Sequence, residues 1–425
     1  MKRVFRVQDQ GKLQDVGLRG LAEVPEAQDV HTLATLLQAL IPLAAQAVRE
    51  ALEAAVTALA GPRSGRTGRP PGLARWGHET GSVYLGDQKV PMRYPRLRDR
   101  HRNQEVPLAL YQRLQAPRAA DAGLFRRILL GLSCRDYQAC AEAVPEAFGL
   151  SPSTVSRRFI RASARQLEAL ASRRLDGYDI VALLLDGKTF AADSMVLALG
   201  ITATGEKVLL GFVQTATENE RVGAAFLREL VERGLRADRG LLCVIDGSKG
   251  LRKALQTVFG RQAVVQRCQW HKRQNVVAHL PKGQQAPWTH KLQAAYECPT
   301  YAAAQAALAR CQRELRVLNE SAAQSLAEGL EETLTLHRLG VFRELGVSLK
   351  TTNCLESIHA LVEQRTAKID HWRTSDQKRR WLAAALLDLE PRLRRIKGYH
   401  SLSLLRAALV QELGHPETTK EREAA

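Results

Sequence analysis

The stretch Asp179-Ile-Val-Ala-Leu-Leu-Leu-Asp186 is an uninterrupted apolar run that ends in a carboxylate. A short run of this kind is typical of a strand that is buried on both faces of a sheet. A second run, Leu241-Leu-Cys-Val-Ile-Asp246, lies downstream and also ends in aspartate. The two runs predict two buried strands in one α/β module, each ending in a carboxylate.

The segments around these runs alternate between strand and helix patterns. We expect further strands at Met195–Ala203, Glu206–Thr215 and Ala263–Gln266, and helices at Arg221–Gly234 and Gly250–Phe259. The order of three strands, helix, strand, helix and strand is that of the ribonuclease-H-like fold. Residues 272–345 then contain Ala- and Leu-rich helical patterns without a strand pattern, so we expect an all-helical insertion into this core.

The two aspartates are expected to lie at one edge of the sheet. If their strands are neighbours, two like charges are brought together, which is costly unless a cation lies between them. Such oxygen ligands suit Mg²⁺, which takes a few carboxylates plus water and substrate phosphates. The alternative is that each aspartate caps the following turn, as Asp186-Gly187 and Asp246-Gly247 also permit. The occurrence of both at predicted strand ends favours the metal site.

A third carboxylate is expected from a helix after the insertion. The segment Thr351-Thr-Asn-Cys-Leu-Glu356 opens a helix whose apolar positions are Leu355, Ile358, Leu361 and Val362. Glu356 lies three residues after Asn353, so its alternative role is the partner of an asparagine cap. Glu344 and Glu363 are competing carboxylates nearby. Position along the chain does not choose between these roles.

The composition is that of a globular protein with a strongly basic surface. The 425 residues, 45% hydrophobic and 25% charged, are enough for two or three domains of ordinary size. The 62 Lys and Arg residues against 44 Asp and Glu leave a net charge of +18. A surplus of this size suits a polyanionic partner such as nucleic acid.

The sequence pattern argues against a membrane partner and for a reducing compartment. The most apolar long stretch, Ile41–Ala60, carries Arg49, Glu50 and Glu53 at helical spacing. The first residues are basic, but no apolar segment of a signal peptide follows them. Seven cysteines without a paired framework indicate free thiols. We therefore expect a cytoplasmic protein.

Residues 61–118 are a candidate arm for binding the DNA backbone. Basic residues there far outnumber acidic ones, and arginines recur at nearly alternate positions, at Arg93, Arg96, Arg98, Arg100 and Arg102. Contacts of such side chains with phosphates release counterions. Gly68-Arg69-Pro70 resembles the core of an AT-hook, and Gly86-Asp87 predicts the turn of a hairpin. A solvated basic loop is the alternative.

A helix-turn-helix is expected between residues 119 and 175. Ser133 is a candidate N-cap of a first helix, and Ser151-Pro152 is a typical start of a second. The second helix presents arginines outward, at Arg157, Arg158, Arg161 and Arg165, where they can reach phosphates or guanine edges. An ordinary helical hairpin with a solvated basic face is the alternative.

Cys268 and His271 have the spacing of a zinc-ligand pair, but a tetrahedral site needs two more ligands. His279, His290 and Cys298 are candidates, and none of them forms a second tight pair. We instead expect Cys268 to pack as a small apolar residue and His271 to orient a group at the rim of the active site. Trp270 between them is expected to pack in the core, with base stacking as the alternative.

Four motifs together resemble a known family. Leu183-Leu-Leu-Asp-Gly187, Val244-Ile-Asp-Gly-Ser-Lys-Gly250, Cys268-Gln-Trp-His271 and Thr351-Thr-Asn-Cys-Leu-Glu356 occur in the order seen in Mutator-like transposases, closest to the bacterial insertion-sequence branch. The segment Tyr84–Arg96 and the helix-turn-helix also resemble the DNA-binding half of that family. One departure is Cys354, where these transposases commonly have a small residue.

The resemblance implies an aspartate-aspartate-glutamate triad of Asp186, Asp246 and Glu356 on a ribonuclease-H-like core, with the Cys-x₂-His pair beside it. Such a triad holds two Mg²⁺ ions roughly 3.5–4 Å apart for phosphodiester hydrolysis and strand transfer. Mn²⁺ is expected to substitute for Mg²⁺. The partners implied are double-stranded DNA, as element ends and target, and a second copy of the chain, because transposition joins two ends. In a bacterium, such a protein associates with the nucleoid.

Two rival functions remain open from the sequence. One is a non-catalytic regulator that binds DNA through the helix-turn-helix, and the other is a structure-specific nuclease that never joins strands. We expect seven segments: a helical region (1–60), a basic linker with a small β element (61–118), the helix-turn-helix domain (119–175), the first part of the core (176–271), the insertion (272–345), the end of the core with basic helices (346–415) and a polar tail (416–425).

Overall fold

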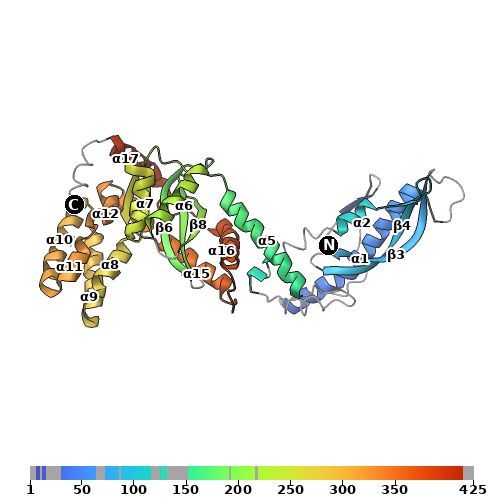
Figure 1. Ribbon diagram of the computed structural model, residues 1–425, viewed down its shortest axis with the longest axis horizontal. Coiled ribbons are helices and arrows are strands. Elements are labelled where there is room, and N and C mark those ends of the chain that lie inside the picture. Colours follow the sequence, from blue (N-terminus) through green and yellow to red (C-terminus); the bar gives the residue numbers. More distant parts are fainter. Residues whose placement is uncertain are drawn as a thin grey trace. The chain divides into compact units, whose positions relative to one another are not determined.

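The computed structural model describes residues 6–9, 12–15, 30–63, 72–85, 88–115, 125–126, 128–131, 152–190, 193–215 and 219–414. The chain divides into two compact units (Figure 1). The first, here called the hairpin unit, comprises Met1–Leu124 and Cys134–Val155. The second, the sheet unit, comprises Phe125–Ser133 and Ser156–Ala425. Each unit is described by itself.

The hairpin unit is built on a long helix that covers a small antiparallel sheet. Its elements are β1 (Arg6–Asp9), β2 (Lys12–Asp15), α1 (Val30–Ala60), β3 (Leu73–Leu85), β4 (Gln88–Asp99), β5 (Gln104–Val106) and α2 (Ala109–Leu114). Leu52 and Val56 of α1 are fully buried in one core with Val83 and Leu97 of the sheet. The predicted hairpin is confirmed and is longer than expected, since β3 and β4 pair from Leu73 to Asp99.

The sheet unit contains a mixed five-stranded sheet in the order β10-β9-β6-β7-β8. Its strands are β6 (Ile180–Phe190), β7 (Asp193–Thr202), β8 (Lys207–Thr215), β9 (Leu241–Ile245) and β10 (Ala263–Arg267). β6, β7 and β8 are antiparallel neighbours, whereas β6, β9 and β10 run parallel. With α6 (Glu220–Glu232) and α7 (Lys249–Phe259), all seven elements predicted between 179 and 266 are present.

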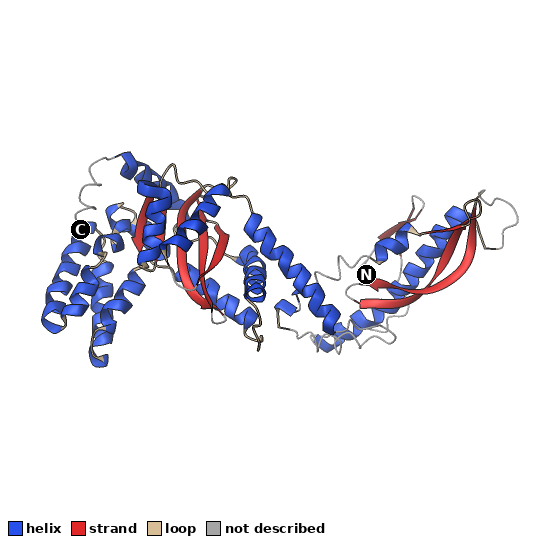
Figure 2. Ribbon diagram, viewed as in Figure 1, coloured by secondary structure: helices blue, strands red, loops and turns tan. Residues whose placement is uncertain are grey.

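Helices cover both faces of this sheet, as Figure 2 shows. On one face, Leu183 and Leu185 of β6 pack in a core with Phe226 of α6 and Leu251 of α7. On the other face, Leu184 belongs to a core supplied by helices from the carboxyl-terminal third of the chain. Burial on both faces explains why the β6 sequence is a continuous apolar run rather than an alternating one.

The rest of the sheet unit is helical, and residues 272–345, all of them described, contain no strand. The helices are α8 (Gln269–Ala278), α9 (Lys282–Tyr296), α10 (Tyr301–Leu318), α11 (Glu320–Ala327), α12 (Leu330–Thr333), α13 (Thr335–Arg338), α14 (Phe342–Leu349), α15 (Asn353–Thr366), α16 (Ser375–Leu389) and α17 (Leu402–Gly414). Three short 3₁₀ turns lie at Gly260–Gln262, Glu390–Arg392 and Tyr399–Ser401. Helices α8 to α11 enclose a core of their own, which includes Val276, Leu292 and Leu308.

The buried side-chain amides of Gln266 and Gln269 connect residues 333–336 of the helical segment to the end of strand β10 by hydrogen bonds. Gln266 is fully buried, and its side chain donates to the carbonyl oxygen of Thr333 at 2.9 Å and accepts from the amide of Leu336 at 3.0 Å. Gln269 donates to the same Thr333 oxygen at 2.8 Å. These side-chain hydrogen bonds therefore fix the position of the end of β10 relative to the helices.

Several sequence predictions fall outside the described residues. They are the first helix and turn of the helix-turn-helix (132–151), the Gly68-Arg69-Pro70 motif and the polar tail (416–425). The predicted second helix is present as α5 (Pro152–Ser172). Phe159 on its inner side is buried, as predicted, and its ring is tilted against that of Trp381, with ring centroids 4.5 Å apart.

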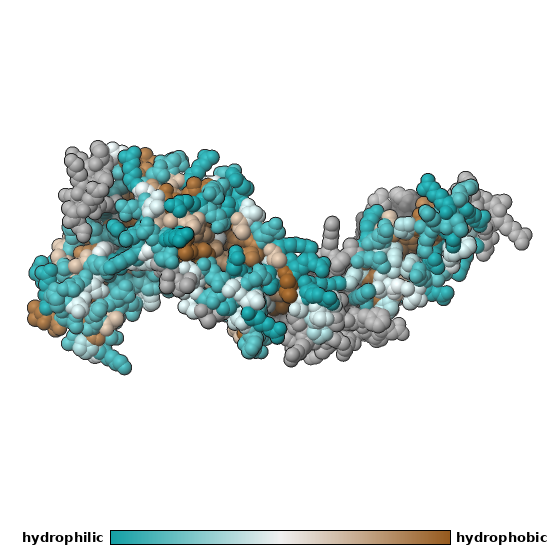
Figure 3. Space-filling view, in the orientation of Figure 1, coloured by the Kyte–Doolittle hydropathy of each residue, from teal (hydrophilic) through white to brown (hydrophobic). Residues whose placement is uncertain are grey.

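Hydrophilic residues cover most of the visible face of the molecule (Figure 3). Within the part of the chain that the structure describes, no helix is both long enough and apolar enough to span a bilayer.

Candidate active site

Asp186 and Asp246 come together at the end of the parallel pairing between β6 and β9. The last paired residues of the two strands are Leu185 and Ile245, so the two aspartates follow at equivalent positions. Asp186 is 5% exposed. The prediction that the two aspartates follow neighbouring strands of one sheet is confirmed.

The prediction that Asp186 ends its strand is wrong. β6 continues to Phe190 because its other neighbour, β7, extends the antiparallel pairing, with Asp186 opposite Leu197. Asp186-Gly187 is therefore strand and not a turn. A strand ends where its pairing ends on both sides, and the sequence of β6 alone carries no information on the length of β7.

Asp246, in contrast, does leave the sheet. Its Oδ1 accepts a hydrogen bond from the backbone amide of Ser248 at 2.9 Å, so the turn-capping alternative also applies to this residue. Gly247 takes φ +111°, and a Cβ there would lie 2.3 Å from Nε of Arg267. The close approach of Arg267 explains why glycine follows this aspartate.

Glu356 lies in the first turn of α15. The cap of that helix is Thr352, and Asn353 is already its first residue, so the predicted role of Glu356 as partner of an Asn353 cap is wrong. Oε1 of Glu356 lies 3.8 Å from Nε2 of His271. Of the competing carboxylates, Glu363 is ion-paired with Lys188 at 2.6 Å and Glu344 is exposed on α14.

His271 lies among the three carboxylates. Burial lowers the pKa of His271, but the hydrogen bond with Cys268 and the negative charges of Asp186 and Asp246 raise it, and the net shift is upward. The imidazole is therefore within electrostatic reach of both aspartates while it contacts Glu356. β6, β9 and α15 therefore each bring a carboxylate toward this imidazole.

The Cys-x₂-His pair is joined to the start of α15 through Thr352. Cys268 is fully buried, and Oγ1 of Thr352 lies 3.7 Å from its Sγ and 3.5 Å from Nδ1 of His271. Burial raises the pKa of the Cys268 thiol, but the hydrogen bond with His271 lowers it, and the lowering prevails. Thr352 was not among the predicted site residues.

A second histidine near Asp186 was also not among the predicted site residues. His359 on α15 is buried, and its Nε2 lies 4.0 Å from Oδ2 of Asp186. Burial and the charge of Lys188 lower the pKa of His359 to about 4. The signal in the sequence was its spacing, since a residue three positions after Glu356 lies on the same face of a helix.

No group of three or more His, Cys, Asp or Glu side chains among the described residues is arranged to hold a metal ion. The chemistry of the carboxylates nevertheless fits a hard cation, which prefers oxygen ligands. Oε1 of Glu356 is buried and has no hydrogen-bond partner. A buried carboxylate oxygen without a hydrogen-bond partner lowers the stability of the fold, and a cation bound to that oxygen would offset this loss.

Trp270 stands at the edge of this site and is 36% exposed, so the prediction that it packs in the core is wrong. Its indole contacts the imidazole of His271 edge-on, with ring centroids 4.8 Å apart.

The predicted DNA-binding arginines differ in how available they are. Arg93 on β4 is exposed, whereas Arg96 donates two hydrogen bonds to Glu105, at 2.9 and 2.7 Å, and also contacts Glu79. Arg157 and Arg161 on α5 are exposed, and Arg158 is partly buried. The structure therefore leaves Arg93 available on the hairpin and neutralises Arg96.

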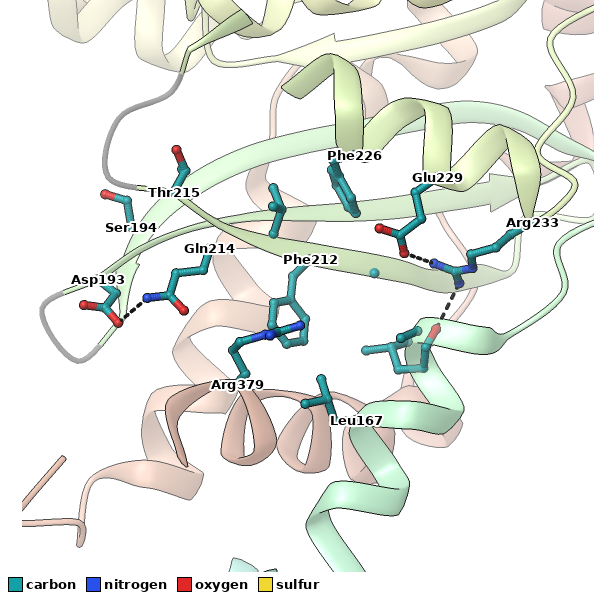
Figure 4. A pocket seen from close by; sticks show the side chains of 14 residues that line it. Leu167, Asp193, Ser194, Phe212, Gln214, Thr215, Phe226, Glu229, Arg233 and Arg379 are labelled. Atoms are coloured by element: carbon teal, nitrogen blue, oxygen red, sulfur yellow. Dashed lines mark hydrogen bonds and ion pairs between the residues drawn. The ribbon is translucent and has the colours of Figure 1, made fainter. Parts of the chain in front are cut away.

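A pocket of about 760 Å³ lies elsewhere in the sheet unit, beside the edge strand β8 and between α5, α6 and α16 (Figure 4). Four of its polar side chains are paired with one another: Asp193 accepts from Gln214 at 2.7 Å, and Arg233 contacts Glu229 at 3.6 Å. The described residues that line it include none of Asp186, Asp246 and Glu356. The sheet edge is the better candidate for the chemistry.

Known proteins are similar to this chain over most of its length. The profile of the family described as "Transposase, Mutator family" matches residues 18–394. The transposase for insertion sequence element IS6120 of Mycolicibacterium smegmatis is 28% identical over 294 residues, which cover 67% of this chain and 89% of the relative. The transposase for IS256 in transposon Tn4001 of Staphylococcus aureus is 26% identical over 71% of this chain and 77% of its own length.

Proposed function

The chain belongs to the Mutator family of transposases, and we propose that the sheet edge carrying Asp186, Asp246 and Glu356 is its catalytic centre. The similar proteins are transposases for bacterial insertion sequence elements. The protein is accordingly an insertion-sequence transposase, an enzyme that cuts DNA and transfers strands. The proposal concerns the residues, the metal and the fold by which it does so.

The observation that carries the proposal is the convergence of three carboxylates from separate elements. Asp186 and Asp246 follow the last parallel pair of β6 and β9. Glu356 contacts His271, whose pKa both aspartates raise. Like charges gather in this way at sites where a cation balances them.

The fold proposed for this unit is ribonuclease-H-like. The order of strands and helices from β6 to β10, with three antiparallel strands followed by two parallel ones, supports this assignment. The helical segment between β10 and α15 is then an insertion in the core. The hairpin unit and α5 are proposed to bind element ends as double-stranded DNA.

Asp186, Asp246 and Glu356 are the residues proposed to hold two Mg²⁺ ions, with Mn²⁺ as a substitute. Such ions activate the attacking oxygen and stabilise the leaving oxygen of a phosphodiester. His271, held by Cys268 and Thr352, keeps Glu356 at the sheet edge through their contact. The reaction joins DNA ends in pairs, so the active form is proposed to be a dimer or larger on DNA.

The test is cleavage and strand transfer on duplex DNA that carries the flanking sequence of the element. Wild-type protein is compared with Asp186→Asn in Mg²⁺ and in Mn²⁺, with Asp238→Asn, an exposed aspartate of the same unit, as the matched control. We expect Asp186→Asn to bind the DNA normally and to lose both nicking and joining. Asp238→Asn should behave as wild type.

The outcomes separate the rival functions. Nicking without joining in the wild type indicates a nuclease, and tight binding without chemistry in either protein indicates a regulator. Retained cleavage by Asp186→Asn contradicts the proposed catalytic centre.

A further inference from the structure

We propose that His359 is a positioning residue that orients the carboxylate of Asp186 toward the bound cation. The inference rests on the proposed function and adds to the site a residue outside the predicted triad and the Cys-x₂-His pair. It concerns the way in which α15 contributes to catalysis: one helix supplies a ligand, Glu356, and also a support for a ligand on a different element.

The geometry places His359 against Asp186 in a dry environment. The side chains of His359 and Asp186 are each 8% exposed, and Nε2 and Oδ2 are 4.0 Å apart. Nε2 of His359 is buried and makes no hydrogen bond. A buried ring nitrogen without a hydrogen-bond partner lowers the stability of the fold. Its presence next to a carboxylate therefore indicates a function.

Helix geometry makes the two functions of α15 compatible. Glu356 and His359 are three residues apart, so they lie on one face of the helix and point to the same sheet edge. Leu355, Ile358 and Val362 pack in the core beneath that edge and fix the rotation of the helix. The helix therefore presents both polar side chains to the carboxylates without a rearrangement of its backbone.

A separation of 4.0 Å is longer than a hydrogen bond. Hydrogen bonds at catalytic groups are often long in the free enzyme and shorten when metal and substrate bind. Carboxylates that hold a metal generally accept a hydrogen bond from a neighbouring donor, and His359 would fill that role for Asp186. His359 is buried, its Nε2 lies 4.0 Å from Oδ2 of Asp186, and as a ring N–H this nitrogen is able to donate to the carboxylate.

The neighbours of His359 leave its ring free to face Asp186. Lys188, on the same strand as Asp186, is held by Glu363 at 2.6 Å, on the same helix as His359. A ring N–H orients a carboxylate by hydrogen bonding.

The experiment measures Mn²⁺ binding by the full-length protein, with electron paramagnetic resonance of the free ion as readout. His359→Leu fills the space without a donor, whereas His359→Gln replaces Nε2 by an amide of similar reach. We expect the affinity for Mn²⁺ to fall about 10- to 100-fold in His359→Leu and to recover in His359→Gln to within a few-fold of wild type.

Two further variants keep the test decisive. His359→Asn retains an amide but shortens its reach, and we expect it to bind Mn²⁺ more weakly than His359→Gln even where His359→Leu does not fold. His337→Leu removes another buried histidine, on α13, whose Nε2 faces the carbonyl oxygens of Tyr296 and Cys298. This control should leave Mn²⁺ binding unchanged.

Asp186→Asn separates the failure of this inference from the failure of the proposed function. If Asp186→Asn loses Mn²⁺ binding while His359→Leu and His359→Asn match the wild type, the inference is wrong and the metal site stands. Equal loss in His359→Gln and His359→Leu, with unchanged melting temperatures, also overturns the inference. If Asp186→Asn binds Mn²⁺ as the wild type does, the metal site itself is wrong, and the inference with it.

Discussion

The sheet edge and the hairpin are both rich in charge, but they are charged in opposite ways. At the sheet edge, carboxylates from β6, β9 and α15 converge although they are far apart in the chain. On the hairpin, Arg96 is neutralised by Glu105, only nine residues away. At the sheet edge the gathered carboxylates face one shared histidine, His271, whereas on the hairpin Arg96 meets opposite charge on both neighbouring strands.

The net charge of a chain therefore predicts the class of its partner, but it does not predict which charged residues contact that partner. Cross-strand pairs of opposite charge form wherever register places them side by side. Like charges are held together only where a fold forces them to be, and the cost marks a functional site. Two of the three predictions below test this contrast, and one tests the uncharged hydrogen bonds that support the sheet edge; they are given in order of decreasing effect.

The largest effect is expected at the sheet edge, where Glu356→Gln is compared with Glu363→Gln. Both carboxylates lie on α15, but Glu356 contacts His271, and Glu363 is 58% exposed and paired with Lys188. A metal ligand is worth several kcal/mol in the transition state, so cleavage should fall about 10³-fold in Glu356→Gln. Glu363→Gln should stay within a few-fold of wild type in the same single-turnover cleavage assay. Equal loss in both variants contradicts the contrast.

The next effect concerns the hydrogen bonds that hold β10, and with it α8, against the helices. Gln266→Leu leaves the buried amide of Leu336 without its acceptor, which costs about 1–3 kcal/mol of unfolding free energy. For a unit of this size, that lowers the melting temperature by several degrees, measurable by calorimetry. Gln256→Leu on the exposed side of α7 is the control and should shift the melting temperature little. An unchanged midpoint in Gln266→Leu disagrees with this account.

The smallest effect is expected on the hairpin, for Arg93→Gln against Arg96→Gln. Loss of one phosphate contact lowers the slope of log affinity against log salt by about 0.9. We expect that change for the exposed Arg93 and almost none for Arg96, whose guanidinium is already bound to Glu105. Fluorescence anisotropy with labelled duplex DNA at several salt concentrations measures both slopes. A larger change for Arg96→Gln indicates that DNA displaces Glu105.

Much of the fold was predictable, because local patterns carry it. Continuous apolar runs predicted β6 and β9, and period-3.6 patterns predicted α6 and α7, each to within a few residues. The resemblance to Mutator-like transposases, drawn from four motifs, is confirmed by the family match. The end of β6 was not predictable, since its last residues are strand only because β7 pairs with them.

The candidate site was predictable in its acidic residues and not in their surroundings. Asp186 and Asp246 are marked by the strands they follow, and Glu356 by its motif. Thr352 carries no local signal that separates it from a capping residue, and the spacing of His359 from Glu356 does not by itself separate His359 from a core residue. Their roles depend on contacts with Cys268 and Asp186, which other segments of the chain supply.

By itself, the sequence determined the strands and helices of the sheet unit, the basic surplus and the family, because hydrophobic periodicity and short motifs are local properties of the chain. Only the tertiary structure decided that Asp186 lies inside a strand, that Arg96 is neutralised, and that His359 faces Asp186. These outcomes depend on strand register and helix packing, in which residues distant in sequence become neighbours through the burial of a shared core.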